Sequence, residues 1–119
     1  MKLEIIFALL VTLVLSQQRC QQRSRHLPRN VCVMAFEAGY CNVGSWGKPL
    51  VLFNGGSHRF WNIENDMDSF ILQRGCRLRI ISPSFRDFRD YVAPTRSNWI
   101  QYKLPKMFDD NIGAIECYC

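Results

Sequence analysis

Residues 65–73, NDMDSFILQ, place acidic and amide residues directly before a strand-like apolar run. The same arrangement returns 44 positions later in residues 109–119, DDNIGAIECYC. Similarity at a fixed period indicates an internal structural repeat, in which each copy is one supersecondary unit. The sequence therefore predicts two repeats, one over about residues 31–73 and one over about residues 74–119.

The sequence around these two phrases is typical of β-structure. Short apolar runs alternate with turn signals such as NGG at residues 54–56. No window carries a helical apolar stripe longer than two turns. About four strands in each repeat predict an all-β domain of two Greek-key motifs packed together as a β-sandwich.

Residues 1–16 are predicted to be a secretory signal peptide. The run IIFALLVTLVL is 11 residues long and too short to span a bilayer, and Val14 and Ser16 are small residues at positions −3 and −1 of a cut before Gln17. No later stretch is apolar enough to span a membrane. The mature chain is expected to be a single secreted, extracellular domain without a transmembrane span.

Six cysteines follow the predicted cleavage site: Cys20, Cys32, Cys41, Cys76, Cys117 and Cys119. An even number in an oxidising compartment predicts three disulfides, whose pairing the sequence leaves open. Cys117 and Cys119 share a face of one strand at about the limit for bridging, so each is expected to bond to a different partner. Zinc is a weaker alternative because no CxxC occurs.

Residues 17–30, QQRCQQRSRHLPRN, form a basic arm that contains most of the net charge of +5. Its arginines are Arg19, Arg23, Arg25 and Arg29. Such a Gln/Arg-rich segment is typical of a solvated arm. The alternative is a contact with anionic surfaces such as lipids or carbohydrates, and no nucleic-acid partner is expected.

Two kinds of motif resemble those of the βγ-crystallin family. The family's hairpin pattern, Tyr/Phe-x4-Tyr/Phe-x-Gly, keeps its spacing at Ile80, Phe85 and Asp87 but lacks the first aromatic residue and the glycine. In the first repeat Phe36 and Tyr40 are separated by three residues instead of four. The resemblance covers about residues 31–119 and implies the two-Greek-key sandwich stated above.

The second motif is the family's loop pattern, Asn/Asp-Asn/Asp-x-x-Ser/Thr-Ser. The first repeat matches all but the last position, where Phe70 replaces serine, and the second has Gly113 and Ala114 in place of both hydroxyl residues. The resemblance implies Ca²⁺ binding between the repeats. The ligands that it implies are Asn65, Asp66, Ser69, Asp109 and Asp110.

The implied calcium chemistry is uneven between the loops. Ca²⁺ takes about six to eight oxygen ligands, more than one short loop can direct. The resemblance implies that the Ser69 hydroxyl acts with the Asp110 loop, whereas Gly113 offers no hydroxyl to the Asp66 loop, so one site is degenerate. The alternative is that these residues only form turns, which Asn and Asp favour.

Catalysis is not expected. The chain has two histidines and no GxSxG or HExxH motif, and its cysteines are assigned to disulfides. Asp87 and Asp90 fit a strand with charge pairs to its neighbours better than a catalytic pair. Trp46, between glycines, is the aromatic residue expected to be exposed for a carbohydrate or protein contact.

The sequence thus predicts a secreted, non-enzymatic βγ-crystallin-like structural or binding module, with one degenerate Ca²⁺ site between its two Greek keys. The alternative is a small secreted defence protein, antimicrobial or toxin-like, that acts on anionic membranes through its basic arm. The partner and the oligomeric state are not predicted.

Overall fold

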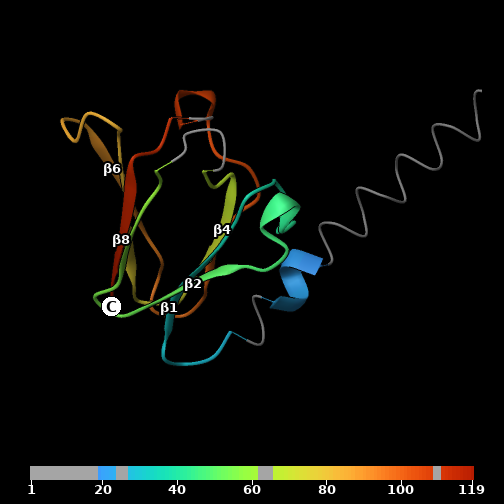
Figure 1. Cartoon of the computed structure of the whole chain (residues 1–119). Helices are drawn as coiled ribbons and strands as arrows, with labels where there is room; N and C mark the ends of the chain where they lie inside the picture. Colours follow the sequence, from blue (N-terminus) through green and yellow to red (C-terminus); the bar gives the residue numbers. More distant parts are fainter. Residues whose placement is uncertain (1–18, 24–26, 62–65, 109–110) are drawn as a thin grey trace, which may run out of the picture.

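The computed structural model describes residues 19–23, 27–61, 66–108 and 111–119 (Figure 1). The predicted signal peptide lies outside these ranges. Within them, no helix is long and apolar enough to cross a membrane.

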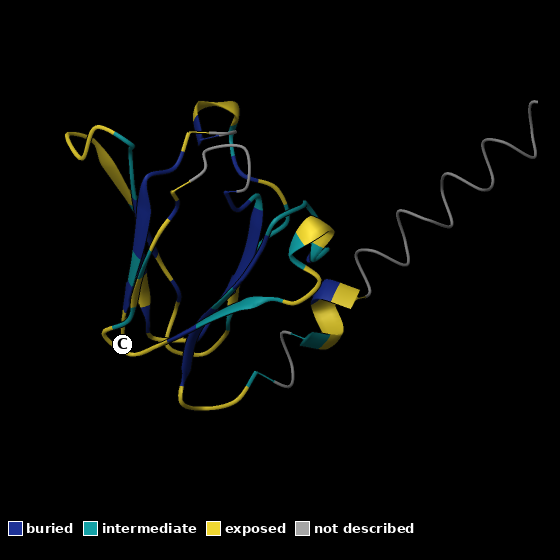
Figure 2. Cartoon of the chain, in the orientation of Figure 1, coloured by how far each residue is buried: buried dark blue, intermediate teal, exposed yellow. Residues whose placement is uncertain are grey.

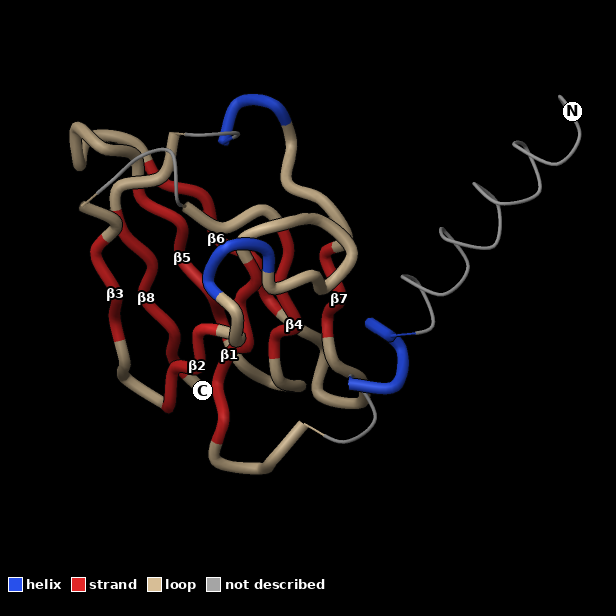
Figure 3. The backbone as a smooth tube through the Cα atoms, turned by 45° about the vertical axis from the view of Figure 1, so that its right-hand side comes forward, coloured by secondary structure: helices blue, strands red, loops and turns tan. Residues whose placement is uncertain are grey.

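Among the described residues, eight strands and two short 3₁₀ helices follow the arm. The strands are β1 (Val31–Phe36), β2 (Leu50–Phe53), β3 (Ser57–Arg59), β4 (Ser69–Leu72), β5 (Arg77–Ile81), β6 (Phe88–Val92), β7 (Trp99–Gln101) and β8 (Ala114–Tyr118), and the helices are η1 (Gly44–Trp46) and η3 (Lys106–Phe108). The strands form two antiparallel four-stranded sheets, β2-β1-β4-β7 and β3-β8-β5-β6 (Figure 3). The prediction of an all-β fold is confirmed.

Each half of the chain gives its third strand to the other half. The first sheet contains β1, β2 and β4 with β7, and the second contains β5, β6 and β8 with β3. Each strand of the first half has a counterpart four strands later in the second half. When every strand is replaced by its counterpart, one sheet order becomes the other. The two halves are therefore related by an approximate repeat, and neither completes a sheet alone.

The two repeats can be aligned by their strand pairing as well as by their sequence. At the paired strands, the offset between the repeats differs by one position from that of the sequence alignment. Phe36 pairs with Ser69 between β1 and β4, and Ile81 pairs with Ala114 between β5 and β8. Backbone hydrogen bonds just before β4 and β8 follow the same relation. The structural counterpart of Ser69 is therefore Ala114, whereas the sequence alignment gave Gly113.

The core lies between the two sheets (Figure 2). Because strand side chains alternate between faces, every second residue of the central strands points inward. The fully buried inward residues are Val33, Ala35, Phe70, Leu72, Leu78, Ile80, Ile115 and Cys117. At about 25 cal/mol per Å² of buried apolar area, this layer is the main stabilising element of the fold.

Three disulfides are present: Cys20–Cys41, Cys32–Cys117 and Cys76–Cys119. The predicted number is confirmed, and Cys117 and Cys119 do bond to different partners. The Cys32–Cys117 bridge joins β1 to β8 across the sandwich and spans a sequence separation of 85 residues. A bridge over so long a loop restricts the unfolded chain strongly, by about 4–5 kcal/mol in the chain-entropy estimate.

Candidate functional site

Asp66 ties together the two loops that the sequence paired. Its side chain is buried, and its Oδ2 atom accepts a hydrogen bond from the backbone N–H of Ile112 at 2.9 Å. Ile112 lies in the segment before β8 and is itself fully buried. The first loop therefore contacts the second through a carboxylate. The other predicted acidic and amide ligands, Asn65, Asp109 and Asp110, lie outside the described residues.

Ser69 supports the loop between β1 and β2. Its fully buried hydroxyl donates to the carbonyl oxygen of Ala38 at 2.6 Å and accepts from the N–H of Cys41 at 3.1 Å. Buried polar groups bond to the nearest unsatisfied partners, and here these are backbone groups of the β1–β2 loop. The expected pairing of this hydroxyl with the Asp110 loop stays a prediction, because Asp110 lies outside the described residues.

The β1–β2 loop needs this support because its backbone is strained. Tyr40 and Cys41 have φ angles of 58° and 59°, in the left-handed region that side chains disfavour. Each such residue costs about 1 kcal/mol or more. The Cys20–Cys41 bridge, the bond to Ser69 and a bond from Tyr40 N–H to the Tyr102 carbonyl at 2.7 Å hold the loop in this shape.

The described residues fit a Ca²⁺ ion only in part. Asp66 brings a buried carboxylate to the contact between the loops, as a hard cation requires. The Ser69 hydroxyl bonds to two backbone groups, and the Asp110 loop with which it was expected to act lies outside the described residues. In the described part of the site, the Asp66 carboxylate therefore links the two loops by a hydrogen bond.

The N-terminal arm is docked rather than fully solvated. Residues 19–23 are helical, and Cys20 packs with Phe36 and Ile71 on the outer face of the first sheet. The Arg23 guanidinium lies 5.1 Å from the centre of the Phe36 ring, and burial, with the nearby charge of Arg19, lowers its pKa.

The remaining arginines of the arm differ in exposure. Arg19 is exposed and donates to the Asn42 side chain at 3.2 Å. Arg29 is exposed, and Arg25 lies outside the described residues. Arg23 packs against the protein itself. Among the described residues of the predicted anion-binding arm, Arg19 and Arg29 are therefore the exposed arginines.

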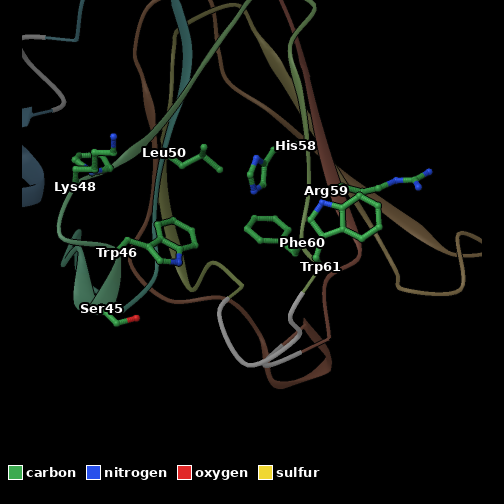
Figure 4. A pocket seen from close by; sticks show the side chains of 9 residues that line it. Ser45, Trp46, Lys48, Leu50, His58, Arg59, Phe60 and Trp61 are labelled. Carbon is green, nitrogen blue, oxygen red and sulfur yellow. The ribbon is translucent and has the colours of Figure 1, made fainter.

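A groove opens beside the edge strands β2 and β3, which belong to different sheets. Its volume is about 490 Å³, and it is lined by Ser45, Trp46, Lys48, Pro49, Leu50, His58, Arg59, Phe60 and Trp61. Figure 4 shows Trp46 facing Phe60 across it, with Lys48 and Arg59 on opposite sides. The sequence singled out Trp46, but the expectation that it is exposed was wrong, because it is partly buried against the core. The other lining residues were missed, because separate loops bring them together.

The GSWG turn aims Trp46 into the groove. The Glu37 carboxylate accepts hydrogen bonds from the N–H of Ser45, at 2.9 Å, and from its hydroxyl. Gly44 has a φ of +59°, and a Cβ there would lie 2.6 Å from Glu37 Oε1. Glycine is therefore favoured at this position, and the turn places the Trp46 and Phe60 rings nearly parallel, with centroids 6.1 Å apart.

The opposite wall comes from β3 and the residues after it. By strand alternation His58 and Phe60 share the inward face, and their rings meet edge to face at 4.8 Å. Burial lowers the pKa of His58, so its imidazole is neutral at pH 7. The Arg59 guanidinium lies 4.8 Å from the Phe85 ring centre and 5.8 Å from that of Trp61.

Aromatic and cationic groups define the chemistry of this groove. Among the nine described lining residues, His58 is the only candidate general base, and no carboxylate or thiol accompanies it. The walls are instead aromatic, with cations at the sides. Such a mixture is typical of a ligand site with an apolar body and charged margins.

Comparison with known proteins adds no assignment: no family model, curated protein or solved structure matches the chain. The similarity to βγ-crystallins therefore stays a prediction. Function is argued below from the fold and from the two sites just described.

Proposed function

We propose that this chain is a secreted, non-enzymatic structural or binding module of the βγ-crystallin type. The observation that carries the proposal is the strand order of the two sheets. A Greek key returns its fourth strand beside its first, as β4 lies beside β1 and β8 beside β5. With β3 and β7 exchanged, two such motifs would form one inseparable sandwich.

Cysteine usage supports secretion. All six cysteines are in disulfides, and such a framework persists in oxidising compartments. The docked arm and the bridged loops make a rigid surface. The neutral His58, alone among aromatic and cationic groups, supports binding rather than catalysis.

The proposal includes one degenerate Ca²⁺ site at the paired loops, held by Asp66 with Asn65, Asp109 and Asp110. The buried Asp66 carboxylate, aimed at the second loop, supports it. A bound cation would supply charge that holds the two loops together. Ser69 holds the β1–β2 loop with its hydroxyl, so the proposal rests on the acidic and amide residues.

Thermal unfolding of the oxidised mature protein in EDTA and in millimolar Ca²⁺ tests this proposal. A ligand that binds only the folded state, at about 100 times its Kd, adds about 2.7 kcal/mol. For a domain of this size the midpoint should rise by about 10 °C or more. Asp110→Asn should abolish the rise, whereas Asp87→Asn, which removes an exposed carboxylate elsewhere, should not.

The alternative outcomes separate the parts of the proposal. A wild-type midpoint that is the same in EDTA and in Ca²⁺ would reject the calcium site and leave a metal-free module. A backbone assignment by NMR that pairs β3 with β6 or β7, instead of with β8, would reject the crystallin-type strand exchange itself.

A further inference from the structure

We propose that the groove beside β2 and β3 binds an acidic carbohydrate chain, with sugar rings on the Trp46–Phe60 wall and anionic groups at Lys48 and Arg59. This goes beyond the proposed function, since it names a ligand class for a surface that the calcium loops do not use. Within the described residues, the groove shares no lining residue with those loops.

The wall of the groove suits sugar rings. Trp46 and Phe60 stack at an interplanar angle of 13° with ring centroids 6.1 Å apart, so together they form one aromatic pair in the lining of the groove. Aromatic faces carry partial negative charge, and a pyranose presents a face of polarised C–H bonds that packs on them. A volume of about 490 Å³ accommodates a few such rings.

The charges of the groove select an acidic ligand. Lys48 and Arg59 are exposed on its two sides (Figure 4), and no carboxylate occurs among the nine described lining residues. Arg59 packs near the Trp61 and Phe85 rings, which orders its planar fork before a ligand arrives. Such a fork suits carboxylate and sulfate groups.

A second, smaller space beside β3 indicates on which side of this strand the ligand would bind. This smaller space, about 340 Å³, shares His58 and Arg59 with the groove but contains the Glu116 carboxylate. The Glu116 carboxylate would repel the anionic groups of the ligand, so an acidic chain is favoured only on the Lys48 side. Half-buried, neutral His58 lies between the two spaces and can bond a sugar hydroxyl.

A membrane fits the groove less well than a carbohydrate. Its aromatic wall is recessed, since Phe60 is buried and Trp46 is partly buried, whereas insertion into a bilayer requires projecting apolar side chains. Only Trp61, 86% exposed, projects from the described lining. A chain molecule can enter such a recess, with Lys48 and Arg59 at its margins.

The test is calorimetric titration in EDTA with a heparin-derived tetrasaccharide, at about 0.15 M salt to screen long-range attraction. Neutral chitotetraose is the comparison ligand. The acidic tetrasaccharide should bind at least about tenfold more tightly than the neutral one, and Lys48→Gln and Arg59→Gln should each weaken it about tenfold. Trp46→Ala should weaken both ligands.

Arg96→Gln is the matched control, because it removes the same charge from an exposed residue outside the groove. It should leave the affinity unchanged. Lys48→Gln and Arg59→Gln alter exposed side chains, so they test the proposal even if Trp46→Ala unfolds the protein.

Three results would overturn the proposal: equal loss in Arg96→Gln, equal binding of the neutral sugar, or binding only to phosphatidylserine vesicles, which would indicate a membrane partner instead. Absence of binding to the acidic tetrasaccharide would overturn it as well. The proposed calcium-stabilised module could still pass its own test, because the titration contains no Ca²⁺.

Discussion

Replacing Ser69 by alanine tests whether a single buried hydroxyl locks the strained β1–β2 loop. The change leaves the Cys41 N–H and the Ala38 carbonyl without their partner. An unsatisfied buried backbone group costs about 1–3 kcal/mol, and the loss of one oxygen atom leaves almost no cavity. We expect the free energy of unfolding to fall by about 2–4 kcal/mol.

For a domain of this size, 1 kcal/mol corresponds to about 4–8 °C in the unfolding midpoint. Circular dichroism should therefore show a drop of about 10–20 °C for Ser69→Ala, equal in EDTA and in Ca²⁺. Ser84→Ala is the control, since its hydroxyl is exposed and its partners can bond to water. A drop below about 2 °C, or one seen only with Ca²⁺, would refute the loop-locking role.

Three further outcomes follow from particular contacts. The Arg79 guanidinium bonds Asp90 at 2.9 and 3.0 Å and lowers its pKa, so Asp90→Asn should lower the midpoint at pH 7, and its difference from wild type should vanish in melts below the usual aspartate range. Gly113→Ala should lower the chemical-denaturation midpoint, because the new Cβ would lie 2.6 Å from a backbone carbonyl oxygen; an unchanged midpoint contradicts this packing. Replacing Cys20 and Cys41 together by serine should speed tryptic cleavage in the arm, unless docking does not depend on their bridge.

The all-β repeat could be predicted because its signals are local. Alternation and turn residues mark strands within a few positions, and the spacing of Cys117 and Cys119 on one strand was enough to assign them different partners. The depression of the Asp90 pKa by Arg79 also agrees with the charge alternation expected for FRDFRDY.

Contacts between distant segments could not be predicted in the same way. Ser69 bonds to a carbonyl 31 positions earlier, so its sequence neighbours gave no sign of that partner. The predicted offset between the repeats was wrong by one position at the paired strands. Strand pairing, rather than sequence similarity, determines which residues of the two repeats correspond. The arm seemed solvated from its composition, since the Cys20–Cys41 pairing that docks it was one of many possible.

The groove lies where the two halves differ most. Residues 37–49 connect β1 to β2, whereas the corresponding β5–β6 connection, residues 82–87, is less than half as long. The longer loop contains η1, and its GSWG turn supplies the Trp46 wall. A shared β framework explains why both halves fold alike, but shared framework residues cannot explain a ligand site on one side only. The added loop length, supported by Glu37, Ser69 and the Cys20–Cys41 bridge, is therefore the part of the chain on which the proposed binding depends.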